Sequence, residues 1–376
     1  MNSIVIGACF GDEGKGSTVN YLCKQSDKPL VVRFNGGHQV GHTSVEGEIR
    51  HVFSNFGSGT LVGAPTYVSE FCTVDPIGVN NELRVLTDNS ITPDVFYNAN
   101  AMVVTPYDIL SNVNDINNKN NGTVGVGFGA TIQRNEDNYK LYVRDLYYPK
   151  IRDMKLSLIK EYYRYILKLF NSNIDIDKVS LDNFKNACDL LLERFKVVDN
   201  IRGIYSKNTD LIFEGGQGIM LDMDYGFFPH VTRSNTTSKN AMTILNNLGI
   251  SPNFFNVNTY YITRAYQTRH GNGFMTNEGY DMSYITENLN ETNVNNKYQG
   301  NFRKSPLDLD LLNYALSCDN QYNDTNKNIV VTCLDQVPEA FPICVNNEII
   351  LGNCETIQKE IKMDVKILKC FSERGM

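Results

Sequence analysis

The stretch GACFGDEGKGS at residues 7–17 decides how this chain begins to fold. The apolar, β-branched residues 4–6 precede it and predict a buried strand. Residues 17–22 predict a helix that follows it, with Ser17 or Thr18 as the N-cap. A strand, a glycine-rich turn, a lysine and a helix make a phosphate cradle. Glycines expose backbone N–H groups to an anion, and the helix N-terminus adds partial positive charge.

Two carboxylates, Asp12 and Glu13, lie inside this loop. They would repel a phosphate group, so we expect that a cation or a proton transfer needs them. Lys15 is expected to neutralise phosphate oxygen. Cys9 also lies near the loop, and burial beside the strand explains it better than catalysis does. The alternative for the whole stretch is a tight glycine turn without a ligand.

The composition is that of an ordinary globular protein. The chain has 376 residues, 41% of them hydrophobic and 20% charged, and a net charge of −7 without runs of Lys or Arg. These features argue against nucleic acid as a partner. No apolar run approaches about 18 residues, and a strand begins at once, so we expect neither a membrane span nor a signal peptide. Nine cysteines without a C-x-x-C pair predict reduced thiols in the cytoplasm and no zinc site.

Strand-like and helical stretches alternate along the chain. This alternation predicts an α/β fold with a large, mostly parallel central sheet flanked by helices, and functional loops at the carboxyl ends of strands. We expect one domain over residues 1–376, with an inserted helical segment at about 151–200 and a mobile polar loop at about 284–302. The expected strands are residues 4–6, 30–34, 66–72, 95–104, 211–213, 254–266 and 328–334. The expected helices are residues 153–171, 180–197, 239–248 and 307–316.

A second glycine-rich loop, NGGHQVGHT at residues 35–43, follows the strand at 30–34. His38 and His42 are four residues apart, but three glycines argue against a helix that would make them a metal pair. We expect a loop that presents one imidazole to a ligand. Surface histidines in a flexible turn are the alternative. A third glycine-rich loop is expected at residues 120–131.

Three motifs together resemble the adenylosuccinate synthetase family. They are GDEGKG at 11–16, GGHQVGHT at 36–43 and FEGGQGIMLDMDYGFFPHVTRSNTT at 213–237. The third motif is long and highly specific, and the resemblance runs in order from residue 3 to about 335. It implies that family's fold, a large and mostly parallel sheet with a P-loop-like phosphate-binding loop. It also implies a homodimer.

The resemblance implies a two-step ligase reaction with Mg²⁺. The family phosphorylates O6 of a 6-oxopurine nucleotide and then displaces the phosphate with the amino group of L-aspartate. Asp12 would take the N1 proton and then bind magnesium, and the carbonyl of Gly41 would complete the metal shell. His42 would donate to charge that develops near O6, while Lys15 and the loop amides hold phosphate.

The resemblance also assigns the binding residues. The triphosphate set is Gly11, Glu13, Gly14, Lys15, Gly16, Gly41, His42, Thr43 and Asp335. The purine nucleotide set is Asp12, Gln39, Thr123, Arg134, Gln217, Leu221 and Thr232, and Arg134 is expected to act across the dimer. The aspartate set is Gln299, Gly300, Asn301 and Arg303.

Two positions depart from the family pattern. Asn301 stands where the family has an arginine that touches both the aspartate and the ribose 2′-hydroxyl, so the preference for ribose is expected to weaken. In the motif TCLD, Cys333 stands where the family has a lysine that packs on guanine. The family's C-terminal stretch with Gly-Pro and arginine is also absent. Either GTP or ATP therefore fits as the phosphate donor.

Two substrates remain open on the sequence. IMP would give adenylosuccinate. A viral branch of the family converts dGMP to N6-succinyl-2-aminodeoxyadenylate with ATP, and the protein would then act in the host cytoplasm. Asp12 does not exclude guanine, because a carboxylate accepts from both N1–H and a 2-amino group. A ligase for another amino acid and a non-catalytic nucleotide-binding switch are the further alternatives.

Overall fold

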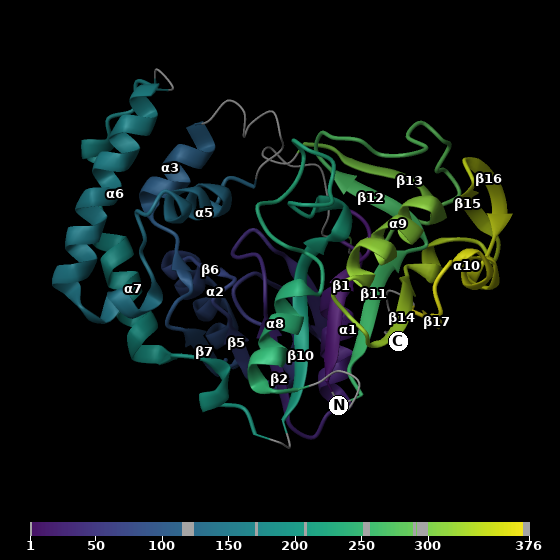
Figure 1. Cartoon of the computed structure of the whole chain (residues 1–376), viewed down its shortest axis with the longest axis horizontal. Helices are drawn as coiled ribbons and strands as arrows, with labels where there is room; N and C mark the ends of the chain where they lie inside the picture. Colours follow the sequence, from purple (N-terminus) through teal and green to yellow (C-terminus); the bar gives the residue numbers. More distant parts are fainter. Residues whose placement is uncertain are drawn as a thin grey trace.

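The computed structural model describes residues 2–114, 124–169, 172–206, 209–250, 256–288, 291 and 300–370. Within these residues the central sheet has nine strands in the order β17-β14-β11-β1-β10-β2-β5-β7-β9 (Figure 1). All of its pairings are parallel. The strands are β1 Ser3–Gly7, β2 Pro29–Arg33, β5 Thr66–Val68, β7 Val95–Asn98, β9 Lys196–Val198, β10 Asp210–Gly218, β11 Asn258–Arg264, β14 Asn326–Thr332 and β17 Lys366–Lys369.

Three smaller sheets border the central one. The largest has the order β12-β13-β15-β16, and the other two pair β3 with β4 and β6 with β8. Their strands are β3 His42–Glu46, β4 Ile49–Phe53, β6 Thr73–Val74, β8 Met102–Val103, β12 Tyr266–His270, β13 Phe302–Asp308, β15 Phe341–Val345 and β16 Glu348–Gly352. The helices are α1 Lys15–Lys24, α2 Pro76–Asp88, α3 Pro106–Asn114, α5 Phe128–Glu136, α6 Pro149–Leu169, α7 Asp182–Arg194, α8 Lys239–Leu248, α9 Leu309–Asn320 and α10 Cys354–Glu360.

Helices cover both faces of the central sheet, so its strands are apolar on both sides. Side chains alternate between the faces along a strand. Ile4 and Ile6 belong to the core that α8, α9 and α10 cover, whereas Val5 packs with Val19 and Cys23 of α1 on the other face. The predicted α/β fold with a mostly parallel sheet is confirmed, and the loops that follow β1, β2, β10, β11 and β14 leave the sheet at one edge.

The helical layer at one end of the sheet is built from α2, α3, α5, α6 and α7 (Figure 1). Helices α6 and α7 confirm the two expected at 153–171 and 180–197, with shifted ends. In α6 the side chains of Leu156, Ile159 and Tyr163 are buried at helical spacing.

Several elements differ from the expectations. Residues 302–308 form β13, and α9 begins only at Leu309 because the Asp308 carboxylate caps it. Strand β10 continues through Gly215 and Gly216 to Gly218, well past the expected residues 211–213. Residues 128–131, expected in a loop, open α5. The part of the polar loop at 289–290 and 292–299 lies outside the described residues.

The cysteines are inside the protein, including Cys9, whose burial beside the first strand was expected. All nine fall within the described ranges, and all are free and buried. In the same ranges, no helix combines the length and the apolar character that crossing a bilayer requires.

Arg134 holds the helical layer together, and this corrects its expected role at a nucleotide or across a dimer. Its side chain has no exposed surface, and its Nε lies 2.8 Å from Oδ1 of Asp108. Its Nη atoms donate to Asp108 Oδ2 and to the carbonyls of Val103 and Tyr139. Tyr163 of α6 donates to the same carboxylate at 2.6 Å. The guanidinium is thus engaged by groups of its own subunit.

Replacing Arg134 should lower the free energy of unfolding by several kcal/mol. Arg134→Met leaves the buried Asp108 carboxylate without its cation, and breaking such a pair costs about 3–5 kcal/mol. Denaturant unfolding followed by circular dichroism would measure the loss. Arg164→Met is the matched control, because Arg164 forms exposed ion pairs on α6 and should change stability far less. Equal effects of the two variants would contradict the structural role of Arg134.

Candidate active site

The phosphate loop, residues 7–16, connects β1 to α1 at the carboxyl edge of the sheet. Its backbone turns sharply, with positive φ angles of 90° at Gly11, 59° at Asp12 and 95° at Gly14. Gly14 is the N-cap of α1, so the helix begins at Lys15, earlier than expected. The reason is that glycine adopts this left-handed conformation without strain. The N–H groups of Lys15, Gly16 and Ser17 precede the first intrahelical hydrogen bond, from the Thr18 N–H to the Gly14 carbonyl, so they have no partner within the helix.

The side chain of Glu13 turns inward, away from a ligand. The residue is 2% exposed, and its carboxylate accepts from the Cys9 N–H at 2.5 Å and lies 3.5 Å from the Lys15 ammonium. A Cβ at Gly7 would lie 2.0 Å from this carboxylate, so only glycine leaves room for it. Burial raises the pKa of Glu13 to about 7. The expected contact of Glu13 with triphosphate is therefore corrected: its side chain supports the loop and Lys15, and only its backbone remains for phosphate.

Asp12 stays at the surface of the loop. Its side chain is 28% exposed, and Oδ2 lies 3.5 Å from Nε2 of His270 at the end of β12. The backbone carbonyl of Asp12 accepts from Arg264 Nε at 2.6 Å. These contacts leave the carboxylate accessible while they fix its backbone. His270 and Arg264 were not predicted, because neither lies in a motif that marks a site.

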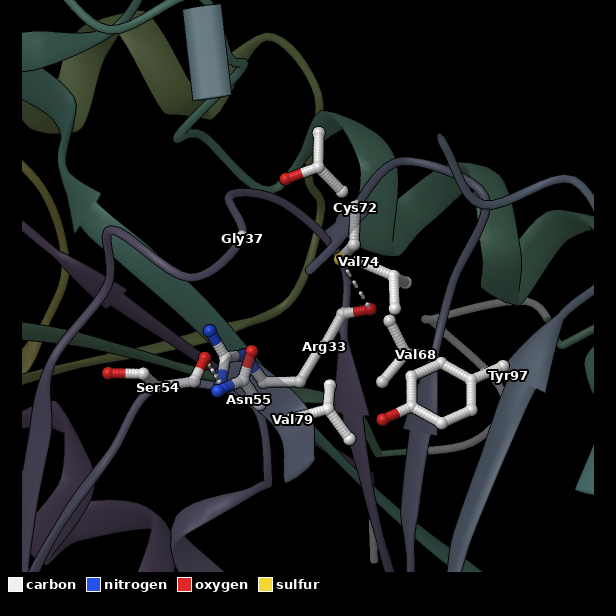
Figure 2. A pocket seen from close by; sticks show the side chains of 10 residues that line it. Arg33, Gly37, Ser54, Asn55, Val68, Cys72, Val74, Val79 and Tyr97 are labelled. Carbon is white, nitrogen blue, oxygen red and sulfur yellow. Dashed lines mark hydrogen bonds between the residues drawn. The ribbon is translucent and has the colours of Figure 1, made fainter. Parts of the chain in front are cut away.

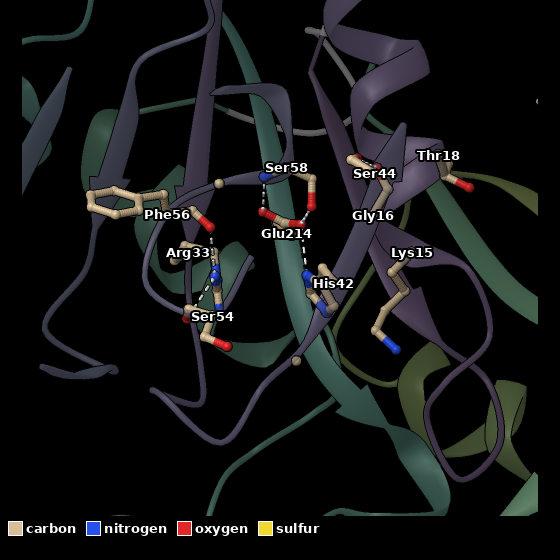
Figure 3. A network of polar contacts seen from close by, with 12 residues as sticks. Lys15, Gly16, Thr18, Arg33, His42, Ser44, Ser54, Phe56, Ser58 and Glu214 are labelled. Carbon is tan, nitrogen blue, oxygen red and sulfur yellow. Dashed lines mark hydrogen bonds and ion pairs between the residues drawn. The ribbon is translucent and has the colours of Figure 1, made fainter. Parts of the chain in front are cut away.

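His42 is held by Glu214, a residue that the sequence analysis did not assign to the site (Figure 3). Nδ1 of His42 lies 2.7 Å from Glu214 Oε1, and both side chains are buried. The other carboxylate oxygen accepts from the Ser58 N–H at 3.0 Å, and the Ser58 hydroxyl donates to Oε1. Although burial opposes it, contact with His42, Arg33 and Ser58 lowers the pKa of Glu214 to about 2. Glu214 is thus an anion that accepts the Nδ1 proton of His42.

The other ring nitrogen of His42, Nε2, makes no contact with Glu214. Nε2 is buried and has no hydrogen-bond partner among the described residues. Buried polar atoms are normally partnered, so this atom is free for a bound molecule. Burial lowers the pKa of His42, and contact with Glu214 opposes that shift in part.

The loops of the predicted triphosphate set converge around the phosphate loop. The Ser44 hydroxyl donates to the carbonyl of Gly16 at 3.1 Å, and a Cβ at Gly16 would lie 2.7 Å from the Thr43 carbonyl. On the other side, the Thr332 hydroxyl donates to the carbonyl of Glu13 at 2.8 Å. These contacts bring the residues that surround Gly41, His42 and Thr43, and the segment that ends at Asp335, next to Gly11, Gly14 and Lys15.

Two members of the predicted purine set, Gln39 and Gln217, lie on the loop after β2 and at the end of β10. The side-chain amide of Asn35 exchanges hydrogen bonds with the backbone of Gly216, at 2.6 and 3.3 Å. The loop that carries Gln39 therefore lies against the end of β10 that carries Gln217, and the amides of both residues include buried atoms without a partner in the described chain. Gln217 has a positive φ of 61°. Orphan amides at the same edge as His42 fit recognition of a polar base.

Two further members of the purine set lie beyond Gln217. The N–H of Thr232 donates to the carbonyl of Leu221 at 2.8 Å, which joins the two halves of the long third motif. Thr123 lies outside the described residues, so its predicted contact stays a prediction.

The predicted aspartate set lies at the start of β13, which pairs antiparallel with β12. Gly300 has a positive φ of 76°, and Asn301 is exposed. Both Nη1 contacts of Arg303 go to the Glu278 carboxylate, at 2.9 and 2.8 Å. Arg269 is the register partner of Arg303, and burial together with Arg303 lowers the pKa of Arg269 to about 10. Gln299 lies outside the described residues.

The oxygen donors at Asp12 and Gly41 suit a hard cation. Mg²⁺ prefers oxygen ligands and usually takes one or two from protein while phosphates and water supply the rest. Asp12 offers a partly exposed carboxylate, and Gly41 offers a carbonyl on an exposed residue. In the described chain, the cluster of three ligand-type side chains is Asp308, Asp310 and Cys344, but Asp308 already caps α9.

Comparisons with known proteins agree with this geometry. A family model described as adenylosuccinate synthetase matches residues 4–370. The adenylosuccinate synthetase of Borrelia recurrentis is 30% identical over 396 residues, which cover 98% of this chain and 87% of that protein.

Two solved structures share the fold. Fully ligated adenylosuccinate synthetase from Plasmodium falciparum has a TM-score of 0.72 at 22% identity, over 96% of this chain and 86% of that one. Succinoaminodeoxyadenylate synthetase of cyanophage S-2L, bound to dGMP and dATP, has a TM-score of 0.65 at 15% identity, over 97% and 90%. With the family model spanning almost the whole chain, this protein belongs to the adenylosuccinate synthetase family of C–N ligases.

Proposed function

We propose that this protein joins L-aspartate to C6 of a purine 5′-monophosphate through a 6-phosphoryl intermediate, converting IMP to adenylosuccinate. The observation that carries the proposal is the His42–Glu214 pair. It offers one buried ring nitrogen, without a partner among the described residues, beside a phosphate loop that carries a lysine. The names of the curated relatives support IMP as the purine.

Activation of the purine requires a base and an electrostatic partner. The Asp12 carboxylate takes the N1 proton, which shifts electron density to O6 for attack on the γ-phosphate. Because Nδ1–H of His42 donates to Glu214, Nε2 can donate to O6 only as part of an imidazolium. Anionic phosphates beside His42 favour that charged form. The proton on Nε2 is thus expected to become available when both nucleotides are bound.

Mg²⁺ would be held by Asp12 and Gly41. When bound, it neutralises charge on the transferring phosphate. Lys15 and the N–H groups of the first turn of α1 bind the phosphate oxygens, and exclusion of water by the surrounding loops strengthens each of these contacts.

A second candidate pair of substrates is dGMP as the purine nucleotide and ATP as the phosphate donor. Asn301 is exposed and carries an amide where the family has an arginine fork. Cys333 is buried and has a positive φ of 58°. Its side chain is short, so it cannot pack along a base as a lysine does. The cyanophage structure that shares this fold was solved with dGMP and dATP. We also propose that the protein is a homodimer and acts in the cytoplasm.

Asp12→Asn should remove most of the activity. The amide cannot accept the N1 proton, and general-base contributions are about 10²–10⁴-fold in turnover. Steady-state phosphate release with saturating substrates measures the effect. Asp27→Asn is the matched control, because Asp27 is exposed beyond the end of α1. A variant of Asp12 that keeps more than about a tenth of the activity would refute the assigned role.

His42→Asn should lower kcat much more than it raises KM for the purine nucleotide. The Nε2 donor acts on charge that develops during phosphoryl transfer, so its loss affects the transition state more than the ground state. His38→Asn is the control in the same loop, since His38 contacts Asn55 away from the phosphate loop. An unchanged kcat with a raised KM would mean that His42 only binds the substrate.

Product analysis by mass spectrometry tests the function itself. IMP, dIMP, GMP and dGMP would each be offered with aspartate and either ATP or GTP. If Asn301 and Cys333 have removed the two discriminating contacts, the deoxyribonucleotides should be used at least as well as their ribo counterparts, and ATP about as well as GTP. A roughly hundredfold preference for IMP with GTP, about 2.7 kcal/mol, would contradict this relaxed specificity. Triphosphate hydrolysis without purine or aspartate would instead indicate a nucleotide switch.

A further inference from the structure

Arg33 is a buried cation beside the catalytic pair. It ends β2, its side chain is 3% exposed, and its Nη1 donates to the carbonyls of Phe56 at 3.1 Å and Ser54 at 3.4 Å. Among the described residues, none of its nitrogens forms an ion pair with a carboxylate. A buried charge without such a partner is costly, so a specific role is expected to retain it.

The register of the sheet places Arg33 next to Glu214. The two residues are Cα partners in the parallel pairing of β2 with β10. Side chains of register partners project from the same face of a sheet. The same row continues through Val68 of β5 to Tyr97 of β7. Glu214 on β10 is therefore the acidic residue directly beside Arg33 in this row of side chains across the sheet.

A second route connects Arg33 with Glu214 through residues 54–58 (Figure 3). Arg33 holds two carbonyls of this segment, and Ser58 at its end donates to Glu214 from both its N–H and its hydroxyl. From the opposite side, the carboxylate of Glu82 accepts from the N–H groups of Ser54 and Asn55. The segment is thus fixed on both sides, and its position sets where the donors to Glu214 lie.

The far side of Arg33 faces a small cavity (Figure 2). Arg33 Nε, Thr73 Oγ1 and the Tyr97 hydroxyl are buried without partners in the described chain, and all three residues line a cavity of about 20 Å³. A water molecule needs roughly 10–15 Å³ and two to four polar partners, so one ordered water fits here. Such a water would accept from the Nε–H of Arg33 without adding a competing anion, which leaves the guanidinium charge to Glu214.

We infer that Arg33 is a positioning residue: it neutralises Glu214 and fixes residues 54–58, so that His42 keeps one tautomer with Nδ1–H on Glu214 and Nε2 toward the substrate. The inference rests on the proposed function for the role of His42 in the reaction. The low pKa of Glu214, to which Arg33 contributes after burial and His42, agrees with it. Arg33 itself touches neither substrate nor reacting atoms in this scheme.

The test reads the tautomer of His42 directly. In ¹⁵N-histidine-labelled, ligand-free protein at one fixed pH, the wild type should show a single Nδ1–H form of His42, assigned with His42→Asn. Arg33→Gln keeps an amide donor but loses the charge, so we expect a mixture of tautomers. Its kcat should fall on the order of 10–100-fold, the range seen for groups that orient a catalytic ligand, with little change in KM. Arg33→Lys keeps the charge and should restore much of both.

The control separates positioning from folding. Arg152 is another buried arginine, paired with Asp153 and Asp189 on the helical layer. Arg152→Met should lower stability but leave the tautomer and kcat unchanged. If Arg33→Gln does not fold, Ser58→Ala cuts the same route to Glu214, and tautomer mixing is expected there. An unchanged single tautomer in the folded Arg33→Gln or, failing that, in Ser58→Ala would overturn the inference. Absence of ligase activity in the wild type would refute the proposed function alone, because the tautomer is read without substrates.

Discussion

Parallel pairing of β1 with both β10 and β11 is the constraint on which the site depends. The pairing with β10 is irregular: Val5 faces Glu214, but Gly7 faces Gly218, so β10 contains extra residues between the two pairs. A bulge of this kind turns the strand and re-aims its side chains. The backbone can pass so close only because Gly218 has no Cβ, which would lie 2.3 Å from the Cys9 carbonyl. The bulge presents Gln217 at the phosphate loop while Glu214 stays inside the sheet.

The site concentrates buried charge. Glu13 and Lys15 lie together under the phosphate loop, and Glu214 lies between His42 and Arg33. Each ion is costly to bury, and the mutual contacts offset that cost only in part. The arrangement is consistent with preorganisation, in which the protein holds donors and charges in place before the substrates arrive. The buried nitrogen of His42 and the amide atoms of Gln39 and Gln217 have no hydrogen-bond partner among the described residues, which suits them to receive a ligand.

The predicted aspartate set at the start of β13 is organised around two cations. Arg269 and Arg303 face each other across the β12–β13 pairing, and Glu278 neutralises one of the two. Two guanidinium groups so close together repel each other unless an anion lies between or beside them. The predicted aspartate ligand would supply such an anion. The orphan Nε atoms of both arginines fit the same interpretation.

Much of the fold and part of the site follow from local sequence. The strand, glycine turn and helix around residues 3–24 are encoded by neighbours in the chain, and so are the alternation of elements and the long helices α6 and α7. Asp12, Lys15 and His42 could be named because each lies in a short motif whose spacing carries the chemistry. Specific motifs also identified the family, which the comparisons then established.

The tertiary structure decided which residues support those groups. Glu214 is 172 residues from His42, and the two meet because β10 lies between β1 and β2 in the sheet. The same folding turned Glu13 inward, put His270 beside Asp12 and enclosed Arg134 with Asp108, none of which the motifs predict. Local periodicity reports which face of an element is buried, but not which distant strand becomes its neighbour. Charge pairing and burial between distant residues depend on strand order and register, and only the folded chain sets these.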